Sequence, residues 1–312
     1  MKITPLLVFQ ILVVAMGVVF LIILFIDLKK NKEELKGKGG WINLSIAGII
    51  TQFFDTLGIG SYGPLTAWFK ISKAMPDKLI PGSLNTCTVI TCLFMTLAYT
   101  TVIEVEVVTL FTLVAASTLG AVIGAGIVSK LPQTIIRFGM GIALIIVVFV
   151  MLAGIFGLMP IGGEAVGLTL PKLIISAIIC FVLGALMTIG VGCYAPIMAL
   201  VFAMGLSPAI AFPIMMGSCA FLIPAAGIRF IRANKKDNPT YHKKTSLCVN
   251  FVGLIGVAVA VFIITSIPLT ALKWLVCGVL IYTSIMLIRD GVKGRKSDVG
   301  PKEQDIEVKE QA

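Results

Sequence analysis

The feature of this sequence that most restricts its fold is a break, rich in glycine and proline, that occurs twice inside apolar segments. Thr56 to Pro64 read Thr-Leu-Gly-Ile-Gly-Ser-Tyr-Gly-Pro, and 132 positions later Thr188 to Pro196 read Thr-Ile-Gly-Val-Gly-Cys-Tyr-Ala-Pro. At this offset, nine positions between 56 and 87 are identical to their counterparts. Glycines and prolines that agree at one constant spacing indicate two copies of one structural unit.

The composition places both breaks in a membrane. Hydrophobic residues make up 58% of the chain and charged residues 13%, with a mean hydropathy of +1.06. A water-soluble domain could not carry this much apolar surface, so we expect an all-α polytopic protein in a lipid bilayer. Broken backbone at membrane depth is tolerated only where protein or a water-filled cavity satisfies its polar groups. Paired breaks in two halves therefore indicate a transporter site.

Several other classes are disfavoured by the distribution of polar residues. The net charge of +10 comes from short basic patches between apolar segments, so we expect no nucleic-acid partner. The seven cysteines lie in apolar stretches without metal-ligand or disulfide spacing. The single histidine, His242, lies in a basic loop, and no catalytic triad or phosphate loop is visible. We therefore expect no enzyme, no cofactor and no metal.

The apolar runs and the charges between them divide the chain into six parts. We expect an N-terminal transmembrane anchor (1–28), a basic cytoplasmic loop (29–41), a first repeat (42–158), an external loop (159–171), a second repeat (172–289) and a disordered cytoplasmic tail (290–312). Because basic loops stay in the cytoplasm, the five lysines between 29 and 38 put the N-terminus outside and the C-terminus inside.

The broken segments allow two topologies. If each is a re-entrant hairpin followed by three spans, the first enters from the cytoplasm and the second from outside, which makes the two repeats inverted. The hairpin connections fit this, because the first carries Lys70, Lys73 and Lys78 and the second carries no basic residue. The alternative, one long kinked crossing for each broken segment, would place these lysines outside.

The breaks also suggest how a substrate is held. Pro64, Pro196, Pro81 and Pro213 favour helix starts, and helix N-termini bind anions through free N–H groups and partial positive charge. Alternatively, the glycines only permit close helix packing. The candidate substrate-binding residues are Gly58, Gly60, Ser61, Tyr62, Pro64, Asn85, Thr86, Gly190, Gly192, Cys193, Tyr194, Pro196 and Ser218.

Asp55 is the most informative single residue. An acid deep in an apolar segment is a functional-site hypothesis, and its counterpart in the second copy is Met187. It is either a coupling site for a proton or sodium ion, or a cap for the N–H groups freed by the break. The equivalent cysteines Cys87 and Cys219, and Cys193 in the second break, are either inert core residues or thiols relevant to a sulfur substrate.

The Gly-x-Gly-x-x-x-Pro pattern in two inverted halves resembles the TauE/SafE family of sulfite exporters. The pattern is carried by Gly58, Gly60 and Pro64, and by Gly190, Gly192 and Pro196. The resemblance implies ion-driven export of sulfite or an organosulfonate across the cytoplasmic membrane of bacteria. The chain differs after each break, where it has Ser83, Asn85 and Thr86, or Gly217 and Ser218, instead of a Gly-Thr-Ser-like triplet.

Two other functions remain open from the sequence. A cation exchanger of inverted-repeat design would use Asp55 to bind the transported ion itself. A membrane scaffold would use the broken helices only for packing. A homo-oligomer is compatible with the sequence but is not specified by it.

Overall fold

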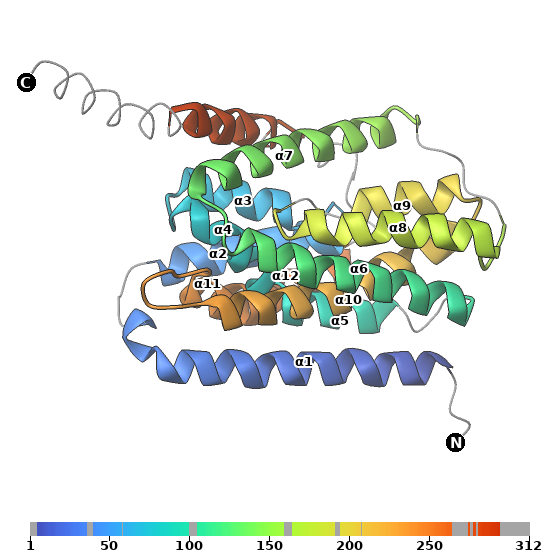
Figure 1. The fold of residues 1–312 in the computed structure, drawn as a ribbon, viewed down its shortest axis with the longest axis horizontal. Helices are drawn as coiled ribbons and strands as arrows, with labels where there is room; N and C mark the ends of the chain where they lie inside the picture. The colour runs from blue at the N-terminus through green and yellow to red at the C-terminus, as the bar shows by residue number, and fades with distance from the viewer. Residues whose placement is uncertain are drawn as a thin grey trace, which may run out of the picture.

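The computed structural model of the chain consists of helices and their connections (Figure 1). It describes residues 5–35, 40–57, 59–99, 105–158, 164–190, 194–206, 208–263, 274, 277–278 and 280–293. Six helical segments in this described part are long and apolar enough to cross a membrane. The expected all-α fold, with several helices long and apolar enough to cross a membrane, is therefore confirmed.

The helices match the main segments expected from the sequence. α1 (Pro5–Lys30) corresponds to the expected N-terminal span. Residues 280–293 form a last helix, called here the C-terminal helix. The elements between them are η1 (Lys32–Leu35), α2 (Trp41–Thr56), α3 (Tyr62–Ile71), η2 (Asp77–Leu79), α4 (Ile80–Cys87), α5 (Val89–Tyr99), α6 (Val107–Val128), α7 (Gln133–Ile155), α8 (Leu170–Met187), α9 (Tyr194–Ala203), α10 (Pro208–Ala233), α11 (Lys243–Leu247), the π-helical segment η3 (Cys248–Val252) and α12 (Gly253–Ile263).

Many large apolar side chains are exposed, whereas several polar side chains are buried. On α6, Leu119, Ile123 and Ile127 recur every four residues and are exposed, so they form one apolar stripe. A stripe of this kind is stable where lipid rather than water covers it. The polar residues buried in the interior include Gln52, Asp55, Asn85 and Asn250.

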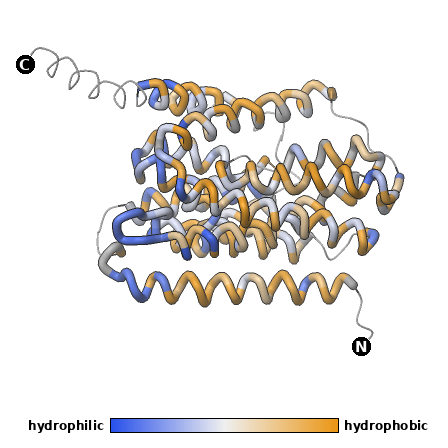
Figure 2. Tube along the Cα trace, in the orientation of Figure 1, coloured by the Kyte–Doolittle hydropathy of each residue, from blue (hydrophilic) through white to orange (hydrophobic). Residues whose placement is uncertain are grey.

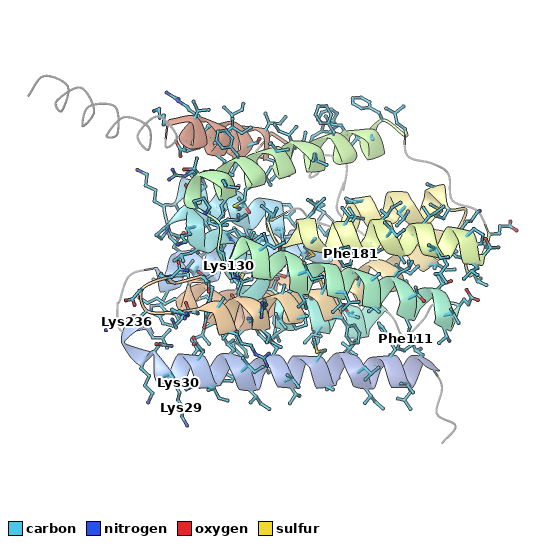
Figure 3. All side chains as sticks on the ribbon, viewed as in Figure 1. Lys29, Lys30, Phe111, Lys130, Phe181 and Lys236 are labelled. Carbon is cyan, nitrogen blue, oxygen red and sulfur yellow. The ribbon has the colours of Figure 1, made fainter. Side chains whose placement is uncertain are left out.

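Several basic residues from distant parts of the chain gather at one end of the helix bundle, called here the basic end. Lys29, Lys30, Lys130 and Lys236 come from three different connections and helix ends, yet they lie at the same end (Figure 3). Hydrophilic residues concentrate there along the whole edge of the molecule (Figure 2). This is the asymmetry that the positive-inside rule associates with a cytoplasmic face.

An ion-pair cluster holds four elements together at the basic end. Lys70 Nζ on α3 lies 2.6 Å from Asp77 Oδ2 and 2.6 Å from Asp290 Oδ2. Arg137 Nε on α7 lies 2.7 Å from the same oxygen of Asp77. The Lys70 and Asp77 side chains are both only 8% exposed, so water screens their pairing weakly. The cluster thus joins α3, η2, α7 and the C-terminal helix.

The contribution of Asp290 to stability is expected to disappear in acid. The hydrogen bond from Lys70 lowers the pKa of the Asp290 carboxyl below its usual 3.8; partial burial opposes the shift, and nearby positive charges reinforce it. Because the folded-state pKa is the lower one, the stabilisation is complete above the unfolded-state pKa and is lost as the pH falls through the folded-state pKa. The side chain is 37% exposed, so we expect an effect below about 1 kcal/mol.

Thermal unfolding of the purified protein tests this expectation. Asp290→Asn should unfold at a lower temperature than the wild type near pH 7, and the difference should shrink and then vanish as the pH falls through the folded-state pKa of Asp290. Asp237→Asn is the control, because Asp237 is an exposed carboxylate in the connection between α10 and α11. A gap between wild type and Asp290→Asn that widens in acid would contradict the assigned role.

Hydrogen bonds at the opposite end join a second set of elements. The backbone N–H of Glu106 donates to Val166 O at 3.1 Å, and that of Leu168 donates to Thr109 Oγ1 at 2.9 Å. These bonds connect the start of α6 to the segment that leads into α8. The end opposite to the basic end therefore contains the connections before α6 and before α8.

Each broken segment folds back on itself as a helical hairpin. Trp68 Nε1, near the end of α3, donates to Asn43 Oδ1 in the first turn of α2 at 2.9 Å. Lys172 Nζ, in the first turn of α8, donates to Met204 O just after α9 at 2.9 Å. The first hairpin therefore opens towards the basic end, and the second opens towards the opposite end.

The first helix of each hairpin packs closely against a helix from the other half of the chain. α2 packs against α12, and α8 packs against α6 (Figure 1). A Cβ on Gly256 of α12 would collide with the carbonyl oxygen of Ile49, and one on Gly120 of α6 with that of Phe181. Small residues let membrane helices approach this closely, so both contacts depend on these glycines.

α1 lies along one side of the bundle and is attached near both of its ends. Near its N-terminus, the ring of Phe9 lies 6.0 Å from that of Phe111 on α6. Near its C-terminus, Tyr241 Oη donates to Asp27 Oδ2 at 2.5 Å, and Lys243 Nζ lies 3.9 Å from the same oxygen. Figure 3 shows Phe111 at the opposite end of the bundle from Lys29 and Lys30.

Three details differ from the sequence-based expectation. The first of the three spans expected after the first broken segment is interrupted at Thr88 between α4 and α5, although Asp77–Ala98 as a whole is long and apolar enough to cross a membrane. Pro213, expected at a helix start, lies inside α10, because that helix already begins at Pro208. The C-terminal helix extends to Lys293, past the expected boundary at 290, and residues 294–312 of the expected tail lie outside the described part.

Candidate functional site

The first break separates α2 from α3 by five residues, 57–61. α2 ends at Thr56, and α3 begins at Tyr62. Gly60 has a φ of +92°, in the left-handed region that side chains disfavour, so glycine suits this turn. Pro64 is the third residue of α3, where its missing N–H breaks no helical hydrogen bond. Gly58, the other glycine of this motif, lies outside the described residues.

Asp55 connects the two sides of the first break. It is the penultimate residue of α2 and is 3% exposed. Its Oδ2 accepts a hydrogen bond from Ser61 Oγ, immediately before α3, at 2.9 Å. A carboxylate beside a helix N-terminus is stabilised by the positive end of the helix dipole. Asp55 therefore reaches across the break, while its role in ion coupling stays a prediction.

α4 lies beside the first hairpin and contributes two of the predicted site residues. Tyr62 Oη donates to Asn85 Oδ1 at 3.2 Å, while Asn85 Nδ2 donates to Pro81 O at 2.8 Å. The two bonds fix the orientation of the Asn85 amide. One residue later, the hydroxyl of Thr86 lies 2.7 Å from that of Ser246 on α11. The structure thus brings Tyr62 and Asn85 into contact and joins Thr86 to the second half of the chain.

Asn250 is a polar site residue that the sequence reasoning missed. Ile90 N donates to its Oδ1 at 2.9 Å, and its Nδ2 donates to Thr86 O at 2.8 Å. In a continuous helix Ile90 N and Thr86 O would bond to each other. The Asn250 amide is inserted between them, which accounts for the interruption at Thr88. The only sequence signal was an asparagine in an otherwise apolar run.

The second break is described up to Gly190 and again from Tyr194. Thr188 follows α8, and Gly190 has a φ of +104°, again in the region that favours glycine. Tyr194 begins α9, and Pro196 is the third residue of that helix. The predicted residues Gly192 and Cys193 lie outside the described part of the chain.

Gly190 places the second break beside the first hairpin. A Cβ built on it would lie 3.4 Å from Leu84 Cδ1 on α4 and 3.8 Å from Thr66 Oγ1 on α3. Thr66 is one turn into α3, and its hydroxyl donates to Tyr62 O at 2.7 Å. Met140 of α7 is the third neighbour of Gly190, with its Cε 3.4 Å from the same Cβ position. The two breaks, far apart in sequence, therefore approach one buried region.

The remaining predicted residues have simpler environments. Ser218 on α10 is fully buried, and its Oγ has no hydrogen-bond partner among the described residues. Cys87 and Cys219 are both fully buried. In the described part of the chain, no group of three or more His, Cys, Asp or Glu residues could hold a metal ion.

Together these features define a class of protein: an all-helical chain with several helices apolar enough to span a membrane and two broken helical segments, the second of which lies beside α3 and α4 at Gly190. Comparisons of the chain with protein-family models, with curated proteins and with solved structures returned no match.

Proposed function

We propose that the protein is a secondary transporter of a small anion, built from two inverted-topology repeats. The first repeat would contain α2 to α7, and the second α8 to the C-terminal helix. In the first, the broken hairpin is followed by three further segments: α4–α5 together, α6 and α7. In the second, it is followed by α10, by α11, η3 and α12 together, and by the C-terminal helix. Both short helices, α3 and α9, have ten residues, and their starts, Tyr62 and Tyr194, are related by the same offset as the motifs.

The inverted arrangement is supported by the two hairpin directions and by the helix packing. The hairpins open towards opposite ends of the bundle, as the Trp68–Asn43 and Lys172–Met204 hydrogen bonds indicate. The first helix of each proposed repeat also packs on the fourth segment of the other, α2 on α12 and α8 on α6. Reciprocal packing of this kind is what a pseudo-twofold axis in the membrane plane would produce, and it suits alternating access.

The anion assignment is carried by the position of the second break, where Gly190 lies close to Thr66, one turn into α3. The N-termini of α3 and α9 would then present partial positive charge to one buried region. At the first break this charge already faces Asp55, whereas the equivalent residue at the second break is Met187. The anion is therefore assigned to the second break, which has no carboxylate at the equivalent position.

The identity of the anion follows from the resemblance to sulfite exporters. Sulfite and small organosulfonates are compact oxyanions that a helix N-terminus can bind without lysine or arginine. The hydroxyl of Ser218, which has no hydrogen-bond partner among the described residues, would be one further donor in the second repeat. With the basic end in the cytoplasm of a bacterial cell, the C-terminus would be cytoplasmic and the N-terminus external.

Counterflow in proteoliposomes tests this function. Vesicles loaded with unlabelled sulfite should accumulate labelled sulfite, and sulfoacetate, thiosulfate or sulfate should compete if it shares the site. Asp55→Asn keeps an oxygen that can accept from Ser61 but removes the charge. We expect this variant to retain counterflow and to lose uptake driven by a sodium or proton gradient.

Other outcomes would select among the alternatives. Sodium or proton flux without any added anion would favour a cation exchanger. Absence of both anion counterflow and cation flux, in protein that is folded and inserted, would favour a scaffold. If no sulfur anion supports counterflow but another anion does, the transport function would stand and the proposed substrate class would be overturned.

A further inference from the structure

Gln52 is a buried polar residue whose side chain is not accounted for by the rest of the described structure. It lies on α2, one turn before Asp55, and is fully buried. Neither its Nε2 nor its Oε1 has a hydrogen-bond partner among the described residues. Burying both ends of a carboxamide without partners is unfavourable, most of all at membrane depth, so the residue requires an explanation.

Three irregular backbone segments occur close to Gln52. A Cβ placed on Gly253, directly after the π-helical segment η3, would lie 2.8 Å from Gln52 Cγ and 3.3 Å from Thr91 Cγ2 on α5. The interruption at Thr88 is one turn before Thr91, and the first break follows Asp55. π-Helical turns and broken helices occur frequently at functional sites, and unwound backbone in transporters provides carbonyl oxygens for coupling ions.

The charge and ligand types here suit a monovalent cation. Residues three apart on a helix are neighbours on one face, so the Gln52 amide and the Asp55 carboxylate project from adjacent positions. One carboxylate balances one positive charge, whereas a divalent ion would retain a net charge in an apolar interior. A hydrated sodium ion would give Oε1 a cation and Nε2 a water oxygen to bond. Both orphaned atoms of Gln52 would then be satisfied.

We propose that Gln52 and Asp55 bind a sodium ion between α2, α5 and η3. The sodium site itself does not depend on the proposed transport function. Only the role of the ion, coupling the sodium gradient to anion movement, rests on that function. The sodium site lies on the side of α2 that faces α5 and α12, while the anion is assigned to the second break. Binding of the two ions can therefore be measured separately.

The test is thermal unfolding of the purified protein without any transported anion. Sodium, potassium or choline chloride is added at constant ionic strength. For the wild type we expect sodium alone to raise the unfolding midpoint, by about 3 °C at a roughly tenfold excess over its dissociation constant. Gln52→Met, which keeps the length of the side chain, should lose the sodium response. It should unfold no earlier than the wild type in sodium-free buffer, because it removes an unsatisfied amide.

Two further variants make the outcome specific. Asp55→Asn should also lose the sodium response. Ser176→Ala on α8 should keep it, because Ser176 is likewise buried and unpartnered among the described residues but lies on a helix that packs against α6. Equal effects of sodium, potassium and choline would overturn the proposal, as would a sodium response that persists in Gln52→Met. Failure of anion counterflow with the sodium response intact would instead reject the transport function and keep the site.

Discussion

Replacing Asn250 by leucine is expected to destabilise the folded protein by about 2–5 kcal/mol, because it leaves two or more buried backbone groups unpartnered. Ile90 N and Thr86 O each form a hydrogen bond with the Asn250 amide, which also donates to Ser246 O at 2.7 Å. Leucine is similar in size but can form none of these bonds. In the variant, Ile90 N and Thr86 O could bond to each other only if α5 moved relative to α10, against which it packs.

The loss can be measured as the yield of folded protein in detergent and as the midpoint of thermal unfolding. Asn43→Leu is the matched control, because it removes one hydrogen bond, from Trp68 Nε1, at a half-buried position. We expect this control to cost about 1 kcal/mol. If Asn250→Leu were no more damaging than Asn43→Leu, the insertion of the amide into the helix would not be what holds the interruption in place.

Replacing Gly190 by alanine is expected to weaken anion binding about tenfold, and so to lower counterflow at low anion concentration, while leaving most of the protein folded. The left-handed φ of +104° costs an alanine roughly 1–2 kcal/mol, which the backbone can relieve only by changing the turn before α9. Because this turn positions the N-terminus of α9, a change in it would move the proposed anion donors. A loss of about 1.4 kcal/mol in anion binding corresponds to a tenfold lower affinity.

Gly157 provides the matched control for this experiment. It also has a positive φ, +69°, and a Cβ at this position would have no neighbour within 4 Å. It follows α7, away from both breaks, so Gly157→Ala carries a similar backbone strain without touching the site. We expect full counterflow from Gly157→Ala in liposomes matched for protein content. Equal transport by the two variants would mean that the second break does not hold the anion.

The candidate site was partly predictable from the sequence because its breaks are local features. Glycine and proline limit the backbone wherever they stand, so the interruption between α2 and α3 was visible in the motif itself. The contact between Tyr62 and Asn85 involved two residues already proposed, but their hydrogen bond depends on how α4 packs against α3. Pro213 shows the limit of such reasoning, since proline is compatible with the interior of α10 as well as with a helix start.

The all-helical fold with helices long enough to cross a membrane, the two breaks and the position of Asp55 beside the first could all be predicted from the sequence. These properties follow from apolar length and from residues that act on their own backbone. In contrast, it is the packing of the helices that lets Asn250 interrupt α4–α5, buries Gln52 without a partner among the described residues and brings Gly190 close to α3. Ile90 and Asn250 are 160 residues apart in the chain. No local pattern encodes such a contact, because it depends on which helix faces become neighbours when the two halves pack together.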